Sequence, residues 1–412
     1  MSHATYDRPS GFALRISPQR RDFLVLSLWL GVTFVQFRGD ELLLYPLALY
    51  YAYSIWRDQR AILPLIARCW VVLMFPIWCL LSVAWAEVPI EALKHAIYLF
   101  LTLLICFQVA ASLTARQMMH AVLLATGVIG VINILYAFGP GDVGRGIFQQ
   151  KNTMGKNMVV LWIVAFGTML DPKAGRWVRL AAAGLAGIAA VMAVLSESAT
   201  AVLLVLASSG VLLAGAVVLR GGLFRASRLC LAFFILAAIT GLGSIILPMM
   251  TSDPIAFILE SFGKDTTLTG RTVLWDYAEE QIAENPVLGV GAGGFWRYHA
   301  SPLVQKIYFE FYKFPNDVFN FHSSLYEIAV HQGLIGLGLA AVALVWGIVK
   351  ITRGAVILGT LPMIYFFSHM LVVVVRTLTE SDFLKPFVLF HMVFWMGALI
   401  AQQELASRAK RR

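Results

Sequence analysis

One histidine of this chain stands where a long polar stretch meets the next apolar run. His322 is followed by two serines and then by an apolar segment that contains spaced glycines. An imidazole in that position is near water yet partly desolvated, which suits the removal of a proton from a hydroxyl group at neutral pH. The alternative is a histidine that caps or anchors a helix, and His299 and His331 compete for the reactive role. The same stretch offers three candidate acids or bases: Glu260, Asp265 and Glu310.

Basic side chains near this stretch indicate a site for an anion. Arg271 begins a segment whose apolar residues recur every four positions, which predicts an amphipathic helix that ends at Asn285-Pro286. A guanidinium beside the free N–H groups of a first helical turn can hold a phosphate, or it can bind lipid headgroups. Arg145 and Lys151 lie in the connection at 139–157 and have the same two interpretations.

The long polar stretch is also rich in aromatic residues between positions 295 and 321. At a membrane surface such residues either form a belt among the headgroups or stack on sugar rings. The sequence leaves both interpretations open.

The composition places these residues in a membrane protein. Hydrophobic residues make up 59% of the 412 residues and charged residues 13%, compared with about 25% charged residues in a soluble domain. Repeated apolar runs are long enough to cross ~30 Å of hydrocarbon, although the first two are short and would suit a re-entrant pair. The expected fold class is an all-α polytopic membrane protein with about 12 transmembrane helices, at residues 22–37, 41–56, 66–85, 92–111, 119–138, 155–170, 177–195, 199–219, 229–250, 323–349, 355–375 and 384–403.

Lysine and arginine residues concentrate in alternate connections, and this indicates the orientation because short cytoplasmic loops retain them. Both termini are therefore expected in the cytoplasm, and the longest connection, between helices 9 and 10, is expected outside it. The pattern also accounts for the formal net charge of +9, so nucleic acid need not be invoked. The predicted organisation is a cytoplasmic N-terminal segment (1–21), transmembrane helices 1–9 (22–250), an outer loop (251–322), transmembrane helices 10–12 (323–403) and a basic cytoplasmic tail (404–412).

Two familiar patterns occur in a context that argues against their usual roles. Residues 289–294 have the formal spacing G-x-G-x-x-G, but they follow Asn285-Pro286 rather than a buried strand. We therefore interpret them as a tight extramembrane turn and not as a dinucleotide site. The four cysteines lie in or beside apolar runs, which favours neither a disulfide framework nor a metal site built from thiols.

Motifs between about residue 140 and residue 390 occur in a recognisable order. His322-Ser323 is followed by nine residues and then by Gly333-x-x-Gly336, and Gly270-Arg271-Thr272-x-x-Trp275 lies upstream. Together these motifs resemble the O-antigen ligase and Wzy-type polymerase superfamily. Three further pieces look like its exopolysaccharide-polymerase (ExoQ-like) branch, namely residues 146–155, 195–201 and 376–381.

The resemblance implies a GT-C-type glycosyltransferase that works without a metal or another cofactor. Such enzymes take a glycan from an undecaprenyl diphosphate carrier and join it to an acceptor hydroxyl with inversion. By motif match, His322 would act on the acceptor and Arg271 would hold the diphosphate. Asp40-Glu41 is the one acidic pair that suggests the metal-dependent relatives of this fold.

One departure from the family pattern affects the diphosphate site. The ligase branch has an arginine directly after the serine that matches Ser198, whereas this chain has Ala199. We therefore expect Lys151 to contact the diphosphate, with Arg145 and Arg376 as helpers. Residues of the matched motifs complete the predicted substrate-binding set: Asn152, Ser198, Trp275 and Glu380.

The leading functional hypothesis is polymerisation of lipid-linked repeat units into an extracellular polysaccharide at the periplasmic face of the bacterial inner membrane. The alternative is O-antigen ligation, the transfer of a finished glycan to lipid A–core or to a protein. A lipid-linked glycan flippase is less favoured, because transporters place charge at the bilayer midplane and the candidate residues here collect at one face. The expected partners are the undecaprenyl-diphosphate-linked donor, a glycan or lipid A–core acceptor, membrane lipids, and polysaccharide export or chain-length proteins.

Overall fold

All regular secondary structure in the described part of the chain is helical. The computed structural model describes residues 17–35, 37, 39–220, 270–299 and 301–411, and within them the strand-like pairing is one isolated bridge between Asp142 and Gly146. The span predicted at 229–250 and the candidate bases Glu260 and Asp265 lie outside the described residues. The expectation of an all-α fold is confirmed for the residues that are described.

Several helices begin at a proline, which is favoured in a first helical turn because its missing N–H is not needed there. Examples are Pro18, Pro89 and Pro302. In chain order the elements are α1 (Pro18–Phe34), α2 (Glu41–Arg57), α3 (Gln59–Arg68), the 3-10 turn η1 (Trp70–Leu73), α4 (Met74–Leu81), the 3-10 turn η2 (Ser82–Ala84), α5 (Pro89–Ser112), α6 (Ala115–Ala137), α7 (Lys151–Leu170), α8 (Arg176–Leu195), α9 (Ala199–Arg220), α12 (Arg271–Glu284), α13 (Pro302–Glu310), α14 (Ser324–Leu358), α15 (Leu361–Thr379) and α16 (Leu389–Lys410).

Seven of the described helices are long and apolar enough to cross a membrane: α5, α6, α7, α8, α9, α14 and α15. The pair Gln59–Arg68 and Trp70–Ala84 is bent by 90° and would add an eighth as one broken span, so the run predicted at 66–85 is not one straight helix. α1 and α2 have 17 residues each, or about 25 Å of helix, which is shorter than the ~30 Å hydrocarbon core. The structure supports a multi-pass membrane protein, and the count of twelve spans stays a prediction.

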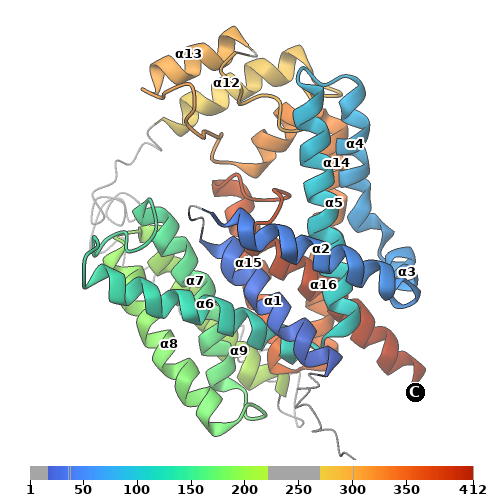
Figure 1. Ribbon diagram of the computed structural model, residues 1–412, viewed down its shortest axis with the longest axis vertical. Helices are drawn as coiled ribbons and strands as arrows, with labels where there is room; N and C mark the ends of the chain where they lie inside the picture. The colour runs from blue at the N-terminus through green and yellow to red at the C-terminus, as the bar shows by residue number, and fades with distance from the viewer. Residues whose placement is uncertain (1–16, 36, 38, 221–269, 300, 412) are drawn as a thin grey trace, which may run out of the picture.

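Helix α15 lies in the middle of the bundle. It packs against α7 and α9 on one side and against α14 and α16 on the other (Figure 1). Glycines permit close contacts here, because a Cβ at Gly347 would lie 2.5 Å from the ring of Phe394, and one at Gly397 would lie 2.6 Å from the ring of Phe366. Small residues at such contacts are typical of membrane bundles. The residues that follow α15 consequently lie between the pair α7 and α9 and the pair α14 and α16.

Helices α12 and α13 form a cap over one end of the bundle (Figure 1). A separate hydrophobic cluster holds the cap together and includes Leu274, Ala278 and Phe321. The amphipathic helix predicted after Gly270 is confirmed as α12, with Leu274 and Ala278 buried. Its pattern differs at one position, since Gln281 is also buried and its amide nitrogen donates to Glu284 within the same helix.

The glycine-rich segment after α12 fills a break in α14. Gly333 has a φ of +63° and interrupts the helix. Beyond the break, the N–H of Leu334 donates to the Pro286 carbonyl at 2.8 Å, and on the other side the N–H of Val290 donates to the Val330 carbonyl at 3.1 Å. A Cβ on Gly333 would lie 2.2 Å from a backbone oxygen of the inserted segment, so only glycine fits. Residues 289–294, which the sequence predicted as an extramembrane turn, therefore dock against α14 at the position of Gly333-x-x-Gly336.

Candidate active site

His322 has a backbone conformation that few residues other than glycine adopt, with a φ of +51°. Its N–H donates to Asn320 Oδ1 at 2.9 Å. The carbonyl of Phe321 accepts a hydrogen bond from Trp275 Nε1 at 2.9 Å, and the Phe321 N–H donates to Glu327 Oε2 at 3.1 Å. Side chains of α12 and α14 therefore fix the turn that presents the His322 ring.

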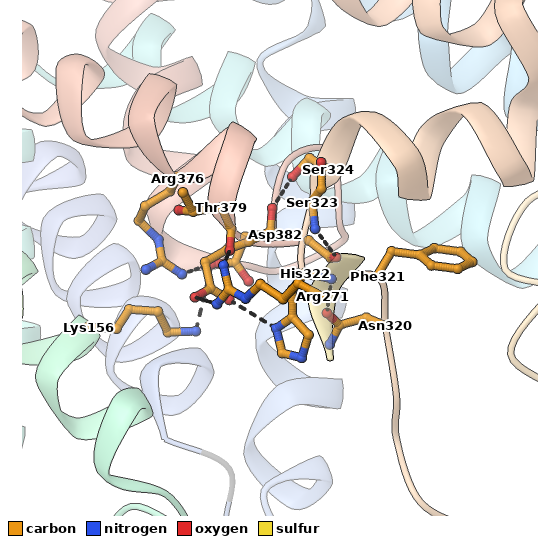
Figure 2. A network of polar contacts seen from close by, with 12 residues as sticks. Lys156, Arg271, Asn320, Phe321, His322, Ser323, Ser324, Arg376, Thr379 and Asp382 are labelled. Atoms are coloured by element: carbon orange, nitrogen blue, oxygen red, sulfur yellow. Dashed lines mark hydrogen bonds and ion pairs between the residues drawn. The ribbon is translucent and has the colours of Figure 1, made fainter. Parts of the chain in front are cut away.

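The turn after α15 is tied to the start of α14. The Ser324 hydroxyl donates to the Glu380 carbonyl at 2.6 Å, and the Ser323 N–H donates to Ser381 Oγ at 3.2 Å. As a result, the Glu380 carboxylate lies beside the imidazole, with 3.8 Å between Glu380 Oε2 and His322 Nδ1. Figure 2 shows both segments meeting around the histidine. The Nδ1 atom is buried and has no hydrogen-bond partner among the described residues.

Arg271, the first residue of α12, reaches the same turn. Its Nη1 donates to the Thr379 carbonyl at 2.9 Å, and its Nη2 lies 3.7 Å from Glu380 Oε1. The helix can start at this point because Gly270 precedes it with a φ of +85°. Glu380 therefore lies between the guanidinium of Arg271 and the ring of His322.

Two further cations approach Asp382 (Figure 2). Arg376, in the last turn of α15, pairs with Asp382 Oδ2, and Lys156 Nζ of α7 lies 3.8 Å from the same oxygen. The Arg376 guanidinium is also 4.9 Å from the centre of the Phe390 ring. Arg376 is 5% exposed, and its buried Nε has no partner among the described residues. One donor of this arginine is therefore available to a ligand.

Both carboxylates favour the charged form in these surroundings. Burial opposes ionisation of Glu380, but the neighbouring His322 and Arg376 outweigh burial and lower the pKa of Glu380 below its ordinary value. Burial also opposes ionisation of Asp382, and here Lys156 and Arg376 outweigh it and lower the pKa of that carboxyl. Three cations and two carboxylates thus converge, and the surplus of positive charge suits an anionic ligand.

The three cations and Glu380 line a small cleft of about 40 Å³ between α7, α9, α12 and α15. Gly155 of α7 lets the turn before α9 approach, because a Cβ there would lie 2.7 Å from Ser196 Oγ. His322 adjoins the cleft through its contact with Glu380. The cleft is lined in part by five of the residues predicted from the sequence: Asn152, Ser198, Arg271, Arg376 and Glu380.

The two remaining basic residues of the predicted set do not line this cleft. Arg145 Nη2 lies 3.0 Å from Asp142 Oδ2 in its own loop, and Lys151 Nζ lies 3.1 Å from Glu197 Oε2. All four of these side chains are more than half exposed. A role for Arg145 and Lys151 in substrate binding stays a prediction.

Trp275, also predicted to bind substrate, has a different visible role. Its indole N–H supports the turn before His322, and its ring stacks on Tyr326 with 5.5 Å between the ring centres. The structure therefore shows Trp275 as a residue that positions the histidine turn.

Sequence reasoning missed Lys156 and Asp382. Lys156 lies five residues into α7, and a lysine inside an apolar span is a signal of function or of a buried partner. Asp382 carried no such signal, because its importance depends on the contact between α7 and the turn after α15.

The competing histidines and the remaining described carboxylate candidate lie elsewhere. His331 Nδ1 is 3.1 Å from the Gly291 carbonyl, where the glycine-rich segment docks. His299 is exposed, and both histidines line a second, larger cavity. Glu310 accepts a hydrogen bond from the Tyr277 hydroxyl. Glu380, which the sequence predicted as a substrate-binding residue, adjoins His322 instead.

Comparison with known sequences identifies the family of this chain. The chain belongs to the O-antigen ligase family, whose sequence profile matches residues 184–341. A similar protein is the exopolysaccharide production protein ExoQ of Rhizobium meliloti (strain 1021), which is 30% identical over 337 residues, or 78% of this chain and 74% of that protein. His322 and Arg271 fall within the profile match, whereas Lys156, Arg376 and Asp382 lie outside it.

Proposed function

We propose that this protein is a Wzy-type polymerase, a GT-C-type membrane glycosyltransferase that joins undecaprenyl-diphosphate-linked repeat units into an extracellular polysaccharide. The observation that carries the proposal is the convergence of Lys156, Arg271 and Arg376 beside a histidine–carboxylate pair. Similarity to a protein named for exopolysaccharide production favours a polymer as the product.

His322 is assigned the role of general base. Nδ1 lies 3.8 Å from the Glu380 carboxylate, whose negative charge favours the tautomer with its proton on Nδ1 and leaves Nε2 as the proton acceptor. The acceptor hydroxyl gives its proton to Nε2 while its oxygen bonds to the anomeric carbon of the donor. The bond between that carbon and the diphosphate oxygen breaks, and its electron pair leaves with the diphosphate. One displacement of this kind inverts the configuration of the sugar.

Arg271, Arg376 and Lys156 are assigned to the departing diphosphate. Glu380 and Asp382 contact these cations in the structure, which offsets the repulsion between like charges. A bound diphosphate takes over part of these contacts, and the unpaired Nε of Arg376 offers it a further donor. Fixed cations at the oxygen where negative charge develops stabilise the transition state for bond breaking.

The lipid-linked donor requires a site where a membrane span meets water. Candidate span α15 ends at Thr379, directly before Glu380, which supports such a position for the cleft. We place the cleft and the cap on the periplasmic side of the bacterial inner membrane and both termini in the cytoplasm. A reporter enzyme fused after Ala174 should report the cytoplasm, and one fused after Gly141 should report the periplasm. Reversed signals would contradict this orientation.

Reconstitution with a defined lipid-linked repeat unit tests the proposed reaction. The purified protein in liposomes should produce a ladder of polymers and release undecaprenyl diphosphate. A product that forms only when lipid A–core is supplied would make the protein a ligase, the alternative that the family description favours. Transport of the donor across sealed vesicles without a new glycosidic bond would instead identify a flippase.

The same assay tests the expectation of metal independence. Polymer formation should continue in excess EDTA, because the proposed charge stabilisation comes from Lys156, Arg271 and Arg376. Loss of activity that added Mg²⁺ restores would contradict this expectation and would make Asp40 and Glu41 the next residues to substitute.

A further inference from the structure

We infer that a second, larger cavity beside the catalytic cleft binds the acceptor glycan. The inference rests on the proposed function, because it locates the second substrate of that reaction. The cavity has a volume of about 690 Å³, which is within the range of roughly 300–1,000 Å³ typical of ligand pockets. Its walls come from α5, α14, the glycine-rich segment, residues 315–319 and the turn at 383–388.

The cavity has a buried floor and an exposed rim. Ala292, Ile328 and Gln332 line it and are 1%, 6% and 2% exposed. Arg297 and Asn316 also line it, and both are exposed. A ligand therefore enters at the surface of the cap and reaches α14 at the bottom.

The lining combines aromatic rings with planar polar side chains. Trp296 and Phe319 contribute rings, and the Trp296 ring is fixed because its Nε1 donates to Glu327 Oε1 at 3.0 Å. Sugars need this combination, since the C–H faces of a pyranose stack on aromatic rings while its hydroxyls both donate and accept hydrogen bonds. For these two rings, the cavity favours sugar stacking over a belt among the lipid headgroups.

Gln332, one of the residues that form the cavity floor, has an unpaired hydrogen-bond acceptor. The Gln332 amide nitrogen donates to Ser82 Oγ at 3.4 Å. The Gln332 Oε1 atom is buried and has no partner among the described residues. Buried oxygens of this kind are nearly always paired in folded proteins, so Oε1 is a place where a ligand hydroxyl can donate.

The charged residues of the cavity carry both signs. Glu327 Oε1 lies 3.6 Å from His331 Nε2 and 3.7 Å from Lys385 Nζ. This mixture differs from the surplus of cations in the catalytic cleft. The cavity therefore suits a stretch of sugar residues better than it suits a diphosphate.

The cavity adjoins the catalytic cleft on the side of the histidine. Phe319 lines the cavity, and its ring centre is 6.5 Å from that of His322. The donor diphosphate is assigned to the cleft lined by α7, α9 and α15. A glycan that approaches His322 from the larger cavity is therefore the one whose hydroxyl is deprotonated, which is the acceptor.

A binding measurement that needs no turnover tests this inference. The probe consists of short oligosaccharides without a lipid, cut from the polysaccharide of the host strain and titrated by calorimetry into the full-length protein in nanodiscs. Ile328→Trp fills the cavity floor and should weaken probe binding at least tenfold. Asn316→Trp narrows the rim and should also weaken probe binding. Because Asn316 is exposed, this variant keeps the test valid if Ile328→Trp does not fold. Leu325→Trp is the control, since Leu325 lies on the same helix, is 40% exposed and does not line the cavity.

The expected result is that both cavity variants lose probe affinity and keep their affinity for the lipid-linked donor. No probe binding by the wild type, or binding that both variants leave unchanged, would overturn the inference even if the wild type polymerises the donor. Loss of donor affinity with unchanged probe binding would also overturn it, because the cavity would then hold the donor glycan. Probe binding that both variants lose, in a protein that forms no glycosidic bond, would support the cavity and refute the proposed function.

Discussion

Two groups of basic side chains in this protein differ in their ion-pair partners and in their exposure to solvent. Arg145 and Lys151 pair with carboxylates of exposed connections, and their side chains are 57% and 52% exposed. Arg271 and Arg376 contact the turn after α15, and their side chains are 28% and 6% exposed. Exposed pairs contribute about 0–1 kcal/mol, because water and salt screen them.

Basic residues that the sequence places in similar outer connections can thus have very different surroundings, which their number alone does not reveal. Both groups belong to the outer connections predicted from the sequence, and both were candidates for the same ligand. Only the second group converges with Lys156 in a cleft that holds a buried, unpaired arginine donor. We therefore expect substitutions in the two groups to differ by orders of magnitude in their effect on turnover.

The largest effect is expected at the histidine beside the converging group. His322→Ala should lower turnover by about 10²–10⁴-fold, which is typical for loss of a general base, and should leave donor binding nearly unchanged. Glycan transfer and donor binding are measured on the same purified sample. A normal rate would show that His322 is not the general base. Weak donor binding with a normal rate per bound donor would make His322 a donor ligand.

The next largest effect is expected at the cation that contacts Glu380. Arg271→Ala should lower turnover by about 10²–10³-fold, the typical cost of losing one group that stabilises developing charge. Arg271→Lys should recover little, because a lysine cannot reproduce the planar two-pronged contact of a guanidinium. Polymer output is compared at equal amounts of folded, membrane-inserted protein. Normal output from Arg271→Ala would remove this arginine from the diphosphate site.

Two lysines of α7 allow the comparison to be made within one helix. Lys156→Met should lower turnover by about 10²-fold, whereas Lys151→Met should lower it by no more than about fivefold, which corresponds to an exposed ion pair. Methionine keeps the length of the side chain and removes its charge in both variants. If Lys151→Met lowers turnover more than Lys156→Met does, Lys151 is the lysine that contacts the diphosphate, as the sequence predicted.

A smaller effect is expected at the carboxylate that faces the histidine. Glu380→Gln should lower turnover at neutral pH by about tenfold, or ~1.4 kcal/mol in the barrier. The lowered pKa of Glu380 keeps this carboxylate negative at neutral pH, and a negative charge stabilises the positive charge that the imidazole gains when it takes the proton of the acceptor hydroxyl. Glutamine keeps the shape of the side chain and removes the charge. Because the pKa of Glu380 is lowered, the difference in rate between the wild type and Glu380→Gln should persist below neutral pH and should disappear only where Glu380 itself is protonated. Equal rates at neutral pH would contradict the pairing.

Local sequence patterns predicted the elements that depend on near neighbours in the chain. The apolar spacing after Gly270 predicted α12, and the proline after Asn285 marked where it ends. The same reasoning could not show the bend at Cys69 between α3 and η1. Apolar residues predominate on both sides of that bend, and hydropathy records their number and not the direction of the backbone.

The candidate site was predictable where a single motif carries it. His322, Arg271 and Glu380 belong to motifs that could be matched one by one, and the structure brings them together. Asp382 gains its importance only because Lys156 and Arg376 approach it from two helices. The spacing of residues along the chain does not show that α7 and α15 both contact the turn that carries Asp382.

The docking of the glycine-rich segment into α14 has a consequence for biogenesis. The segment is synthesised before α14, but its hydrogen-bond partners exist only after α14 has been made. In the docked form the N–H of Leu334 donates to the Pro286 carbonyl, and the Val330 carbonyl, its ordinary helical partner, accepts from the N–H of Val290. The broken form of α14 is thus completed only when a part of the chain that has already left the ribosome returns to it and supplies these hydrogen-bond partners. Maturation of this transmembrane helix therefore depends on the folding of a loop, and the order of synthesis differs from the order of assembly.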